Sequence, residues 1–351
     1  MLENWAVPQK PEREEIKLRL RTAKERLSKQ QMCLKEHGLP VLVLMEGWGA
    51  AGKGSLIGKI IKNIDPRFFK VATMENIGDQ EDRYPFLHRY FVQIPEAGKF
   101  TFLDSGWMNE ICMGRARKEL DSKEYAKKVE SVQRFERQLV DNGYLVMKFF
   151  CHISREEQKK RMDKLSEKKD TRWRVSEEDV WQNKHYKRCL KIFDNYLRDA
   201  DSPVFPWYLV DASCEKWAQL QILETIVQGI DTAFANSALS VPLLQNAFPL
   251  KPISRLDEVS LDKSLTDEEY EKLLDLYQKR LKELHNELYR KKIPVIIAYE
   301  GWDAAGKGGN IKRITEALDP RGYEVHPIAS PEPHEKSRHY LWRFWNRLPK
   351  T

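Results

Sequence analysis

Cysteine is scarce in this sequence, and long apolar runs are missing from it. The five cysteines are widely spaced and form no C-x-x-C pair, which argues against both a disulfide framework and a zinc site. No apolar run approaches the roughly 20 residues that a bilayer span needs, and the N-terminus lacks the basic-then-apolar order of a signal peptide. We therefore expect a cytoplasmic protein that has reduced thiols and does not enter a membrane.

Acidic residues are fewer than basic ones. The chain has 60 Lys and Arg against 53 Asp and Glu, so its formal charge is +7. This surplus favours an anionic partner, and nucleotide, polyphosphate and nucleic acid all satisfy it. At 351 residues with 41% hydrophobic content, the chain is long enough for one large domain or two.

A glycine-rich loop occurs twice, as EGWGAAGKG at 46–54 and EGWDAAGKG at 300–308. Each copy follows a short apolar run and precedes a helix-like stretch, an arrangement in which loop N–H groups, the helix N-terminus and a lysine bind phosphate. The spacing is that of a Walker A loop, but glycine stands where the magnesium-binding Ser or Thr is usual. The candidate phosphate-binding residues are Gly47, Gly52, Lys53 and Gly54 in the first copy and Gly301, Gly306, Lys307 and Gly308 in the second.

Strand-like and helix-like stretches alternate around the first loop, which predicts an α/β fold with a parallel sheet. The expected strands are Val41–Met45, Phe69–Met74, Phe100–Leu103, Tyr144–Phe150 and Tyr208–Val210, and a further strand, Val295–Tyr299, is expected before the second loop. Asp104 directly follows the third strand. Open parallel sheets place their ligands at this end of their strands, although an aspartate there can also serve only a turn.

The second loop belongs to a longer repeat. Residues 41–95 match 295–349 without a gap at a constant offset of 254, and Arg89 is repeated as Arg343. We therefore predict a first domain at 1–236, a proline-containing linker at 237–264, and the start of a second copy at 265–351, which ends before any counterpart of Asp104.

The loops and three further segments resemble the polyphosphate kinase 2 family, in particular its two-domain polyphosphate:AMP phosphotransferases. That family has the loop G-x-D-x-x-G-K-G; the second copy matches every fixed position, whereas the first has Gly49 in place of the aspartate. The further matches are FFCHISREEQKKR (Phe149–Arg161), TRWRVSEED (Thr171–Asp179) and PWYLVDASCEKW (Pro206–Trp217), which resemble the family's strand, lid and final strand.

The resemblance implies a P-loop-type three-layer α/β/α fold with a helical lid at about 154–200, followed by a C-terminally truncated second copy. The implied reaction transfers a terminal polyphosphate phosphoryl group to AMP, giving ADP, or runs in reverse, with Mg²⁺ or Mn²⁺. The resemblance implies that Asp303 and Asp104 bind the metal. It implies a catalytic role for these two residues and for Lys307, Lys53 and Arg161. It implies phosphate binding by the loop glycines, Arg343 and Arg89.

The family's Asp-Arg-Ser-Trp motif is Asp104-Ser105-Gly106-Trp107 here, so its arginine is missing. Because Gly49 and Ser105 together remove a metal carboxylate and a cation, we predict that the first domain is a weak or inactive copy. Two other functions stay open: a non-catalytic phosphate-binding scaffold, and a nucleic-acid-binding protein suggested only by the basic charge. The basic helices around Arg161 can equally form a solvated face. A homo-oligomer also stays open.

Overall fold

The computed structural model describes residues 2, 5–74, 84–236 and 258–349. These residues divide into two compact units, one made of most of residues 1–240 together with Pro331–Trp345, and the other made of most of the remainder. The predicted linker falls largely outside the described residues. No helix in the described part of the chain is long and apolar enough to cross a membrane.

The first unit is built on a five-stranded parallel sheet. Its strands are β1 (Val41–Gly47), β2 (Phe69–Thr73), β3 (Phe100–Asp104), β4 (Leu145–His152) and β5 (Trp207–Asp211), in the spatial order β2-β3-β1-β4-β5. All seven residues of β1 are buried, as expected for a central strand covered on both faces. The α/β fold with a parallel sheet is confirmed.

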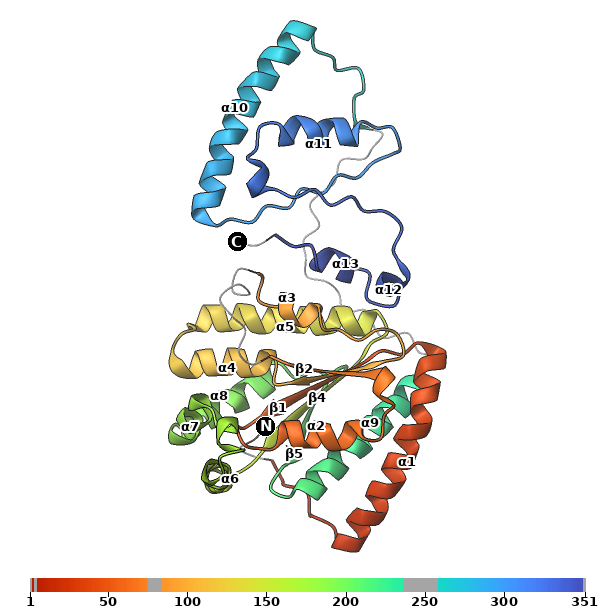
Figure 1. Cartoon of the computed structure of the whole chain (residues 1–351), viewed down its shortest axis with the longest axis vertical. Coiled ribbons are helices and arrows are strands. Elements are labelled where there is room, and N and C mark those ends of the chain that lie inside the picture. The colour runs from red at the N-terminus through yellow and green to blue at the C-terminus, as the bar shows by residue number, and fades with distance from the viewer. Residues whose placement is uncertain (1, 3–4, 75–83, 237–257, 350–351) are drawn as a thin grey trace. The chain divides into compact units, whose positions relative to one another are not determined.

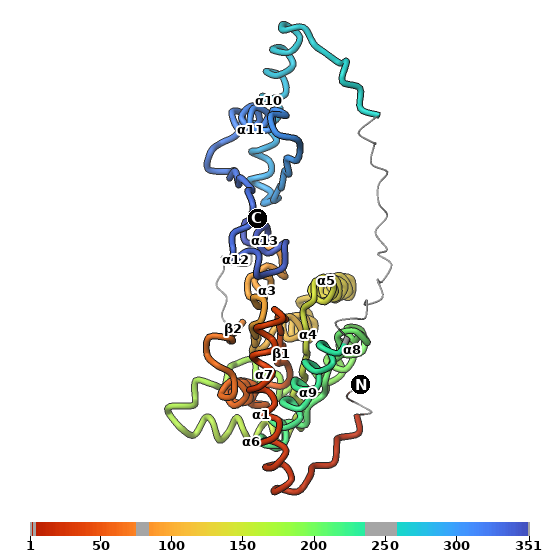
Figure 2. The backbone as a smooth tube through the Cα atoms, turned by 90° about the vertical axis from the view of Figure 1, so that its right-hand side faces the viewer, coloured from red at the N-terminus to blue at the C-terminus, as the bar shows by residue number. Residues whose placement is uncertain are grey.

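Helices cover both faces of the sheet, which gives three layers (Figure 1). They are α1 (Arg13–His37), α2 (Lys53–Ile61), α4 (Trp107–Arg117), α5 (Ser122–Asp141) and α9 (Glu215–Asn236), with the short α3 (His88–Phe91) before β3. In Figure 1, α4 and α5 lie above the sheet and α2 and α9 below it, while α1 packs along α9. Figure 2 views the chain from the right-hand side of Figure 1 and again shows α1 and α9 side by side.

A basic, mostly helical segment covers the carboxyl ends of the strands. It contains α6 (Arg155–Glu167), α7 (Glu177–Lys184) and α8 (Tyr186–Asp199). Ser154 caps α6 by accepting a hydrogen bond from Glu157 N, and a capping box of Ser176 with Asp179 starts α7. Below, "the lid" means residues 155–184.

A short part of the second repeat belongs to the first unit. It includes α12 (Pro333–Lys336) and α13 (Trp342–Trp345). His339 is buried and its backbone N–H donates to the Tyr144 hydroxyl at 2.8 Å, while Arg338 forms an ion pair with Glu96. This segment is therefore fixed by hydrogen bonds and charge as well as by packing.

The second unit contains the helices α10 (Asp267–Lys291) and α11 (Lys307–Thr315), and its described residues include no strand. The predicted strand Val295–Tyr299 is wrong. In the first unit β1 pairs with β3 and β4 but not with β2. Residues 295–349 correspond to β1, α2, β2 and α3 only. They contain no counterpart of β3 or β4, so the strand-like sequences have no adjacent strand to pair with.

Candidate active site

The first phosphate loop connects β1 to α2 through an unusual backbone. Gly47, Ala50 and Gly52 have φ angles of 133°, 56° and 91°. A Cβ added at Gly47 would lie 2.7 Å from the backbone nitrogen of Cys151, so only glycine fits beside β4. The loop thus leads into the N-terminus of α2 at Lys53, and a helix N-terminus favours a bound anion.

Lys53 and Asp104 face the same space at the carboxyl end of the sheet. The Lys53 ammonium group donates to the Trp48 carbonyl at 3.3 Å. Burial raises the pKa of Asp104, and the positive charge of Lys53 opposes this shift. A Cβ added at Gly54 would lie 2.9 Å from Asp104 Oδ2, tighter than ordinary contacts allow. The glycine that replaces the usual Ser or Thr therefore makes room for the aspartate.

A buried acid, Glu46, also belongs to this site and was not among the residues selected from the sequence. Its Oε1 accepts hydrogen bonds from the backbone N–H groups of Met108 at 3.0 Å and Asn109 at 3.3 Å, so it caps the first turn of α4. Burial raises the pKa of Glu46 to about 7, and Lys53 partly offsets that effect. The sequence signal was the acid that directly follows the short apolar run in both copies, Glu46 and Glu300.

The second loop repeats the backbone of the first. Gly301, Ala304 and Gly306 have φ angles of 153°, 60° and 79°. Lys307 donates to the carbonyl oxygens of Gly301 and Trp302, both at 2.7 Å, and begins α11. The phosphate-loop conformation is therefore encoded locally, because it forms here without the flanking strands that surround the first copy.

Arg161 joins the lid to the first loop. Its guanidinium donates to the carbonyl oxygens of Ala51 at 3.0 Å and Ala212 at 2.7 Å, and it is also paired with Glu157. A cavity of about 510 Å³ opens beside it. Its lining includes Ala50, Ala51, Gly52, Arg161, Lys164 and Lys168. Loop residues 50–52 and three lid cations, Arg161, Lys164 and Lys168, thus line one space whose positive charge suits a phosphate chain.

Comparison with known proteins decides the family. The family model for polyphosphate kinase 2 matches residues 10–237 and 264–351, nearly the whole chain. This chain belongs to the polyphosphate kinase 2 family. It is 30% identical over 333 residues to a protein named polyphosphate:AMP phosphotransferase from Pseudomonas aeruginosa, covering 93% of this chain and 66% of the relative. A relative of the same name from Pseudomonas syringae is also 30% identical, with 94% and 67% covered.

Solved structures agree. A crystal structure of a polyphosphate kinase 2 from Pseudomonas aeruginosa superimposes with a TM-score of 0.81 at 27% identity, covering 100% of this chain and 69% of that one. The chain therefore spans about two thirds of the length of the relatives that it matches. The comparisons do not support the expected C-terminal truncation, because this chain covers most of those relatives.

Within this polyphosphate kinase 2 fold, the two repeated arginines are paired with carboxylates. Arg89 forms an ion pair with Glu110, and the Arg343 guanidinium lies 3.5 Å from Glu335. The acids in these two pairs belong to α4 and α12. Their role in phosphate binding stays a prediction.

The candidate metal ligands are carboxylates near the loops, Asp104 at the first and Asp303 at the second. Among the residues that the structure describes, no group of three or more His, Cys, Asp or Glu could hold a metal ion. Asp104 lies beside the first loop, and Asp303 is an exposed member of the second. Mg²⁺ commonly takes one or two carboxylates and completes its shell with water and substrate phosphates, so one carboxylate per loop fits such an ion.

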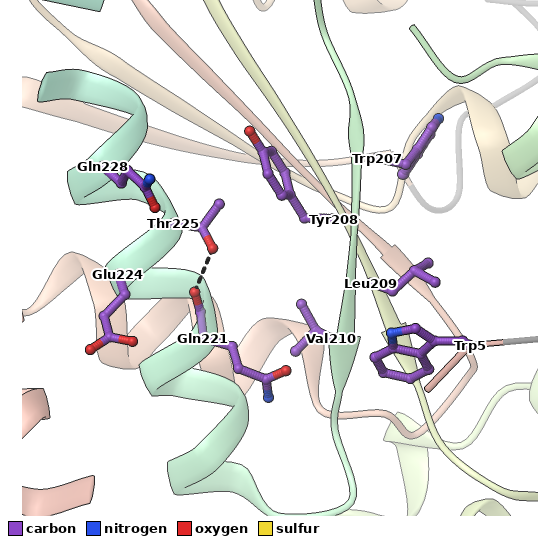
Figure 3. A pocket seen from close by; sticks show the side chains of 9 residues that line it. All are labelled: Trp5, Trp207, Tyr208, Leu209, Val210, Gln221, Glu224, Thr225 and Gln228. Atoms are coloured by element: carbon purple, nitrogen blue, oxygen red, sulfur yellow. Dashed lines mark hydrogen bonds between the residues drawn. The ribbon is translucent and has the colours of Figure 1, made fainter. Parts of the chain in front are cut away.

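A second cavity, of about 420 Å³, lies between β5 and α9 and is lined partly by Trp5 (Figure 3). In it, Thr225 Oγ1 donates to the Gln221 carbonyl at 2.7 Å. None of the site residues selected from the sequence lines this cavity. The charged groups that suit phosphate lie instead at the loop.

Proposed function

We propose that this chain is a phosphotransferase that moves a terminal phosphoryl group between polyphosphate and a nucleotide, converting AMP to ADP in a magnesium-dependent reaction. The observation that carries the proposal is the repeated phosphate loop, in which residues 47–52 and 301–306 share left-handed φ angles at three equivalent positions. The relatives named polyphosphate:AMP phosphotransferase support the choice of substrates.

The reaction would break the bond between the terminal phosphorus and its bridging oxygen and form a bond from that phosphorus to an AMP phosphate oxygen. The shortened polyphosphate leaves with the bridging oxygen. Loop amides and Lys307 would hold the transferring group and neutralise its charge, which is most of what such a transfer requires. A magnesium ion held by Asp303 would supply further neutralisation when bound.

The first loop is proposed as the weaker copy. Gly49 provides no carboxylate where the second loop has Asp303, and Ser105 stands where the family has an arginine. Asp104, Lys53 and Arg161 remain around it. Because a transition-state arginine can contribute about 10³–10⁵ in rate, its absence is expected to slow turnover at this loop severely.

The proposal is tested by incubating the full chain with polyphosphate, AMP and magnesium and measuring ADP. Lys307→Ala should abolish ADP formation, whereas the matched variant Lys53→Ala should retain most of it. EDTA should stop the reaction, and magnesium should restore it. Loss of activity in Lys53→Ala alone would assign the reaction to the first loop instead.

A non-catalytic phosphate-binding scaffold is the second candidate, and one observation favours it. The two candidate metal ligands belong to different copies, Asp104 to the first and Asp303 to the second. A chain that binds polyphosphate tightly but forms no ADP above the Lys307→Ala background would establish the scaffold. Cytoplasmic location stays a prediction. No nucleic-acid partner is expected, and nucleic-acid binding and a homo-oligomer stay open alternatives.

A further inference from the structure

Residue 49 is the position at which the two loops differ in charge, and in the first copy a lid residue occupies the space of its side chain. A Cβ added at Gly49 would overlap Asp179 Oδ1 and lie 2.7 Å from Asp179 Cγ. The φ angle of Gly49 is outside the left-handed range, so its backbone accepts any residue. The three atoms nearest to that Cβ all belong to Asp179.

Asp179 is held where it is by the start of α7. Its Oδ2 accepts a hydrogen bond from the Ser176 backbone N–H at 2.9 Å, and its own N–H donates to Ser176 Oγ at 3.1 Å. Turning the carboxylate away from residue 49 would break this capping box. A side chain at position 49 therefore has to displace the helix start rather than one free side chain.

Both backbone groups of Gly49 are bonded to buried amides of the lid. Gly49 N–H donates to Gln182 Oε1 at 2.8 Å, and the Gly49 carbonyl accepts from Gln158 Nε2 at 3.2 Å. Gln158 Nε2 also donates to Gln182 Oε1 at 2.8 Å, and Asn183 Nδ2 donates to Gln158 Oε1 at 3.0 Å. Gln158 and Gln182 are 0% and 2% exposed, so these bonds are protected from water.

We infer that Gly49, Gln158, Asp179 and Gln182 form a latch that holds the lid on the first phosphate loop when no ligand is bound. The latch requires glycine at residue 49, because the lid approaches the loop backbone through the space that an aspartate would fill. Glycine at residue 49, where the second copy has Asp303, therefore both removes the loop carboxylate and lets the lid close on the loop. The same contacts keep the lid beside the first loop, where the cavity lined by Arg161, Lys164 and Lys168 lies.

Hydrogen exchange measured by mass spectrometry on the full chain without substrate tests the latch. Gly49→Ala adds one methyl group against Asp179, and overpacking of this size should speed amide exchange in peptides covering 177–184 by about tenfold or more. Gly58→Ala is the matched control, because a Cβ at Gly58 meets nothing within 4 Å. Peptides of α1 and α9 should exchange at wild-type rates in both variants.

A double-mutant comparison separates the latch from general damage. Gly49→Ala should speed exchange at 177–184 much less when it is combined with Asp179→Ala, because the overlap with the carboxylate is gone and only a 3.1 Å contact between the two Cβ atoms remains. Gln182→Ala, which removes an acceptor without adding volume, should also loosen the lid. Wild-type exchange in Gly49→Ala, or fully additive effects in the double variant, would overturn the latch. These measurements need no turnover, so their failure leaves the proposed function untouched.

Discussion

Phe91 and Trp345 stack with their ring centroids 3.4 Å apart and their planes 15° from parallel. They are separated by the repeat offset of 254 residues and so occupy equivalent positions in the two copies. Both lie in the first compact unit, at the ends of α3 and α13. The same short element of the repeat is thus used twice on one hydrophobic core.

Trp345→Ala should therefore destabilise the first unit. Trp345 is partly buried against the core, so we expect its removal to lower the free energy of unfolding by about 1–3 kcal/mol, below the full cost for a buried aromatic. Denaturant unfolding followed by circular dichroism measures the change. Trp302→Ala is the control, since that side chain is 85% exposed, and its midpoint should match wild type.

Equivalent glycines in the two loops should respond differently to a methyl group. Gly54→Ala places a Cβ 2.9 Å from Asp104 Oδ2, so it should lower the melting temperature of the chain. At Gly308 a Cβ meets nothing within 4 Å, and Gly308→Ala should be neutral or slightly stabilising. Equal effects of the two substitutions would contradict the proposed crowding at Gly54.

The sequence predicted the first unit well because its elements carry strong local signals. Each of its five strands was placed within about two residues, since apolar runs bounded by Gly, Pro or Asp leave few alternatives. Helix α4 was missed because it follows the Asp104-Ser105-Gly106 turn directly, and its N-cap Gly106 has no capping side chain to signal a helix start. Val295–Tyr299 was wrong because a strand needs neighbours, and pairing is not a local property.

The site was predicted only as far as local motifs reach. The phosphate loops, Lys53 and Asp104 follow from spacing and from strand ends. The contacts of Asp179 with Gly49 and of Glu46 with α4 join residues 130 and about 60 positions apart, and no periodic pattern connects them. Such contacts depend on how α7 and α4 pack, which the sequence pattern does not specify.

Lys148 and Glu136 form a buried ion pair that should be costly to break. Lys148 Nζ lies 2.8 Å from Glu136 Oε2, and both side chains are 0% exposed. Lys148→Met leaves a buried carboxylate without its partner, and we expect a loss of about 3–5 kcal/mol of unfolding free energy. The double variant Lys148→Met with Glu136→Leu should recover most of this lost unfolding free energy. Chemical denaturation measures both variants. Lys279→Ala breaks an exposed pair with Asp275 and should cost less than about 0.5 kcal/mol.

Glu46 should make the chain less stable as the pH rises. Its pKa is about 7 in the folded protein against 4.5 for the free side chain, so the folded state binds the proton more tightly. This proton stabilises the folded state fully below about pH 4.5. The stabilisation is lost as the pH rises through about 7, because the folded state then releases the proton as well. Glu46→Gln keeps an oxygen for the N–H groups of Met108 and Asn109 but does not ionise. Relative to wild type, the unfolding free energy of this variant should therefore rise by up to about 3 kcal/mol between pH 4.5 and 8.

Urea titrations at pH 4.5, 6 and 8 measure that difference directly. Glu300→Gln alters the equivalent residue of the second loop, whose side chain is exposed, so its unfolding should follow wild type at every pH. A constant gap between Glu46→Gln and wild type across this range would contradict the prediction, because it would show that Glu46 is ionised in the folded chain throughout. Its role at the site would then be that of a fixed carboxylate capping α4, with Lys53 rather than a proton balancing its charge.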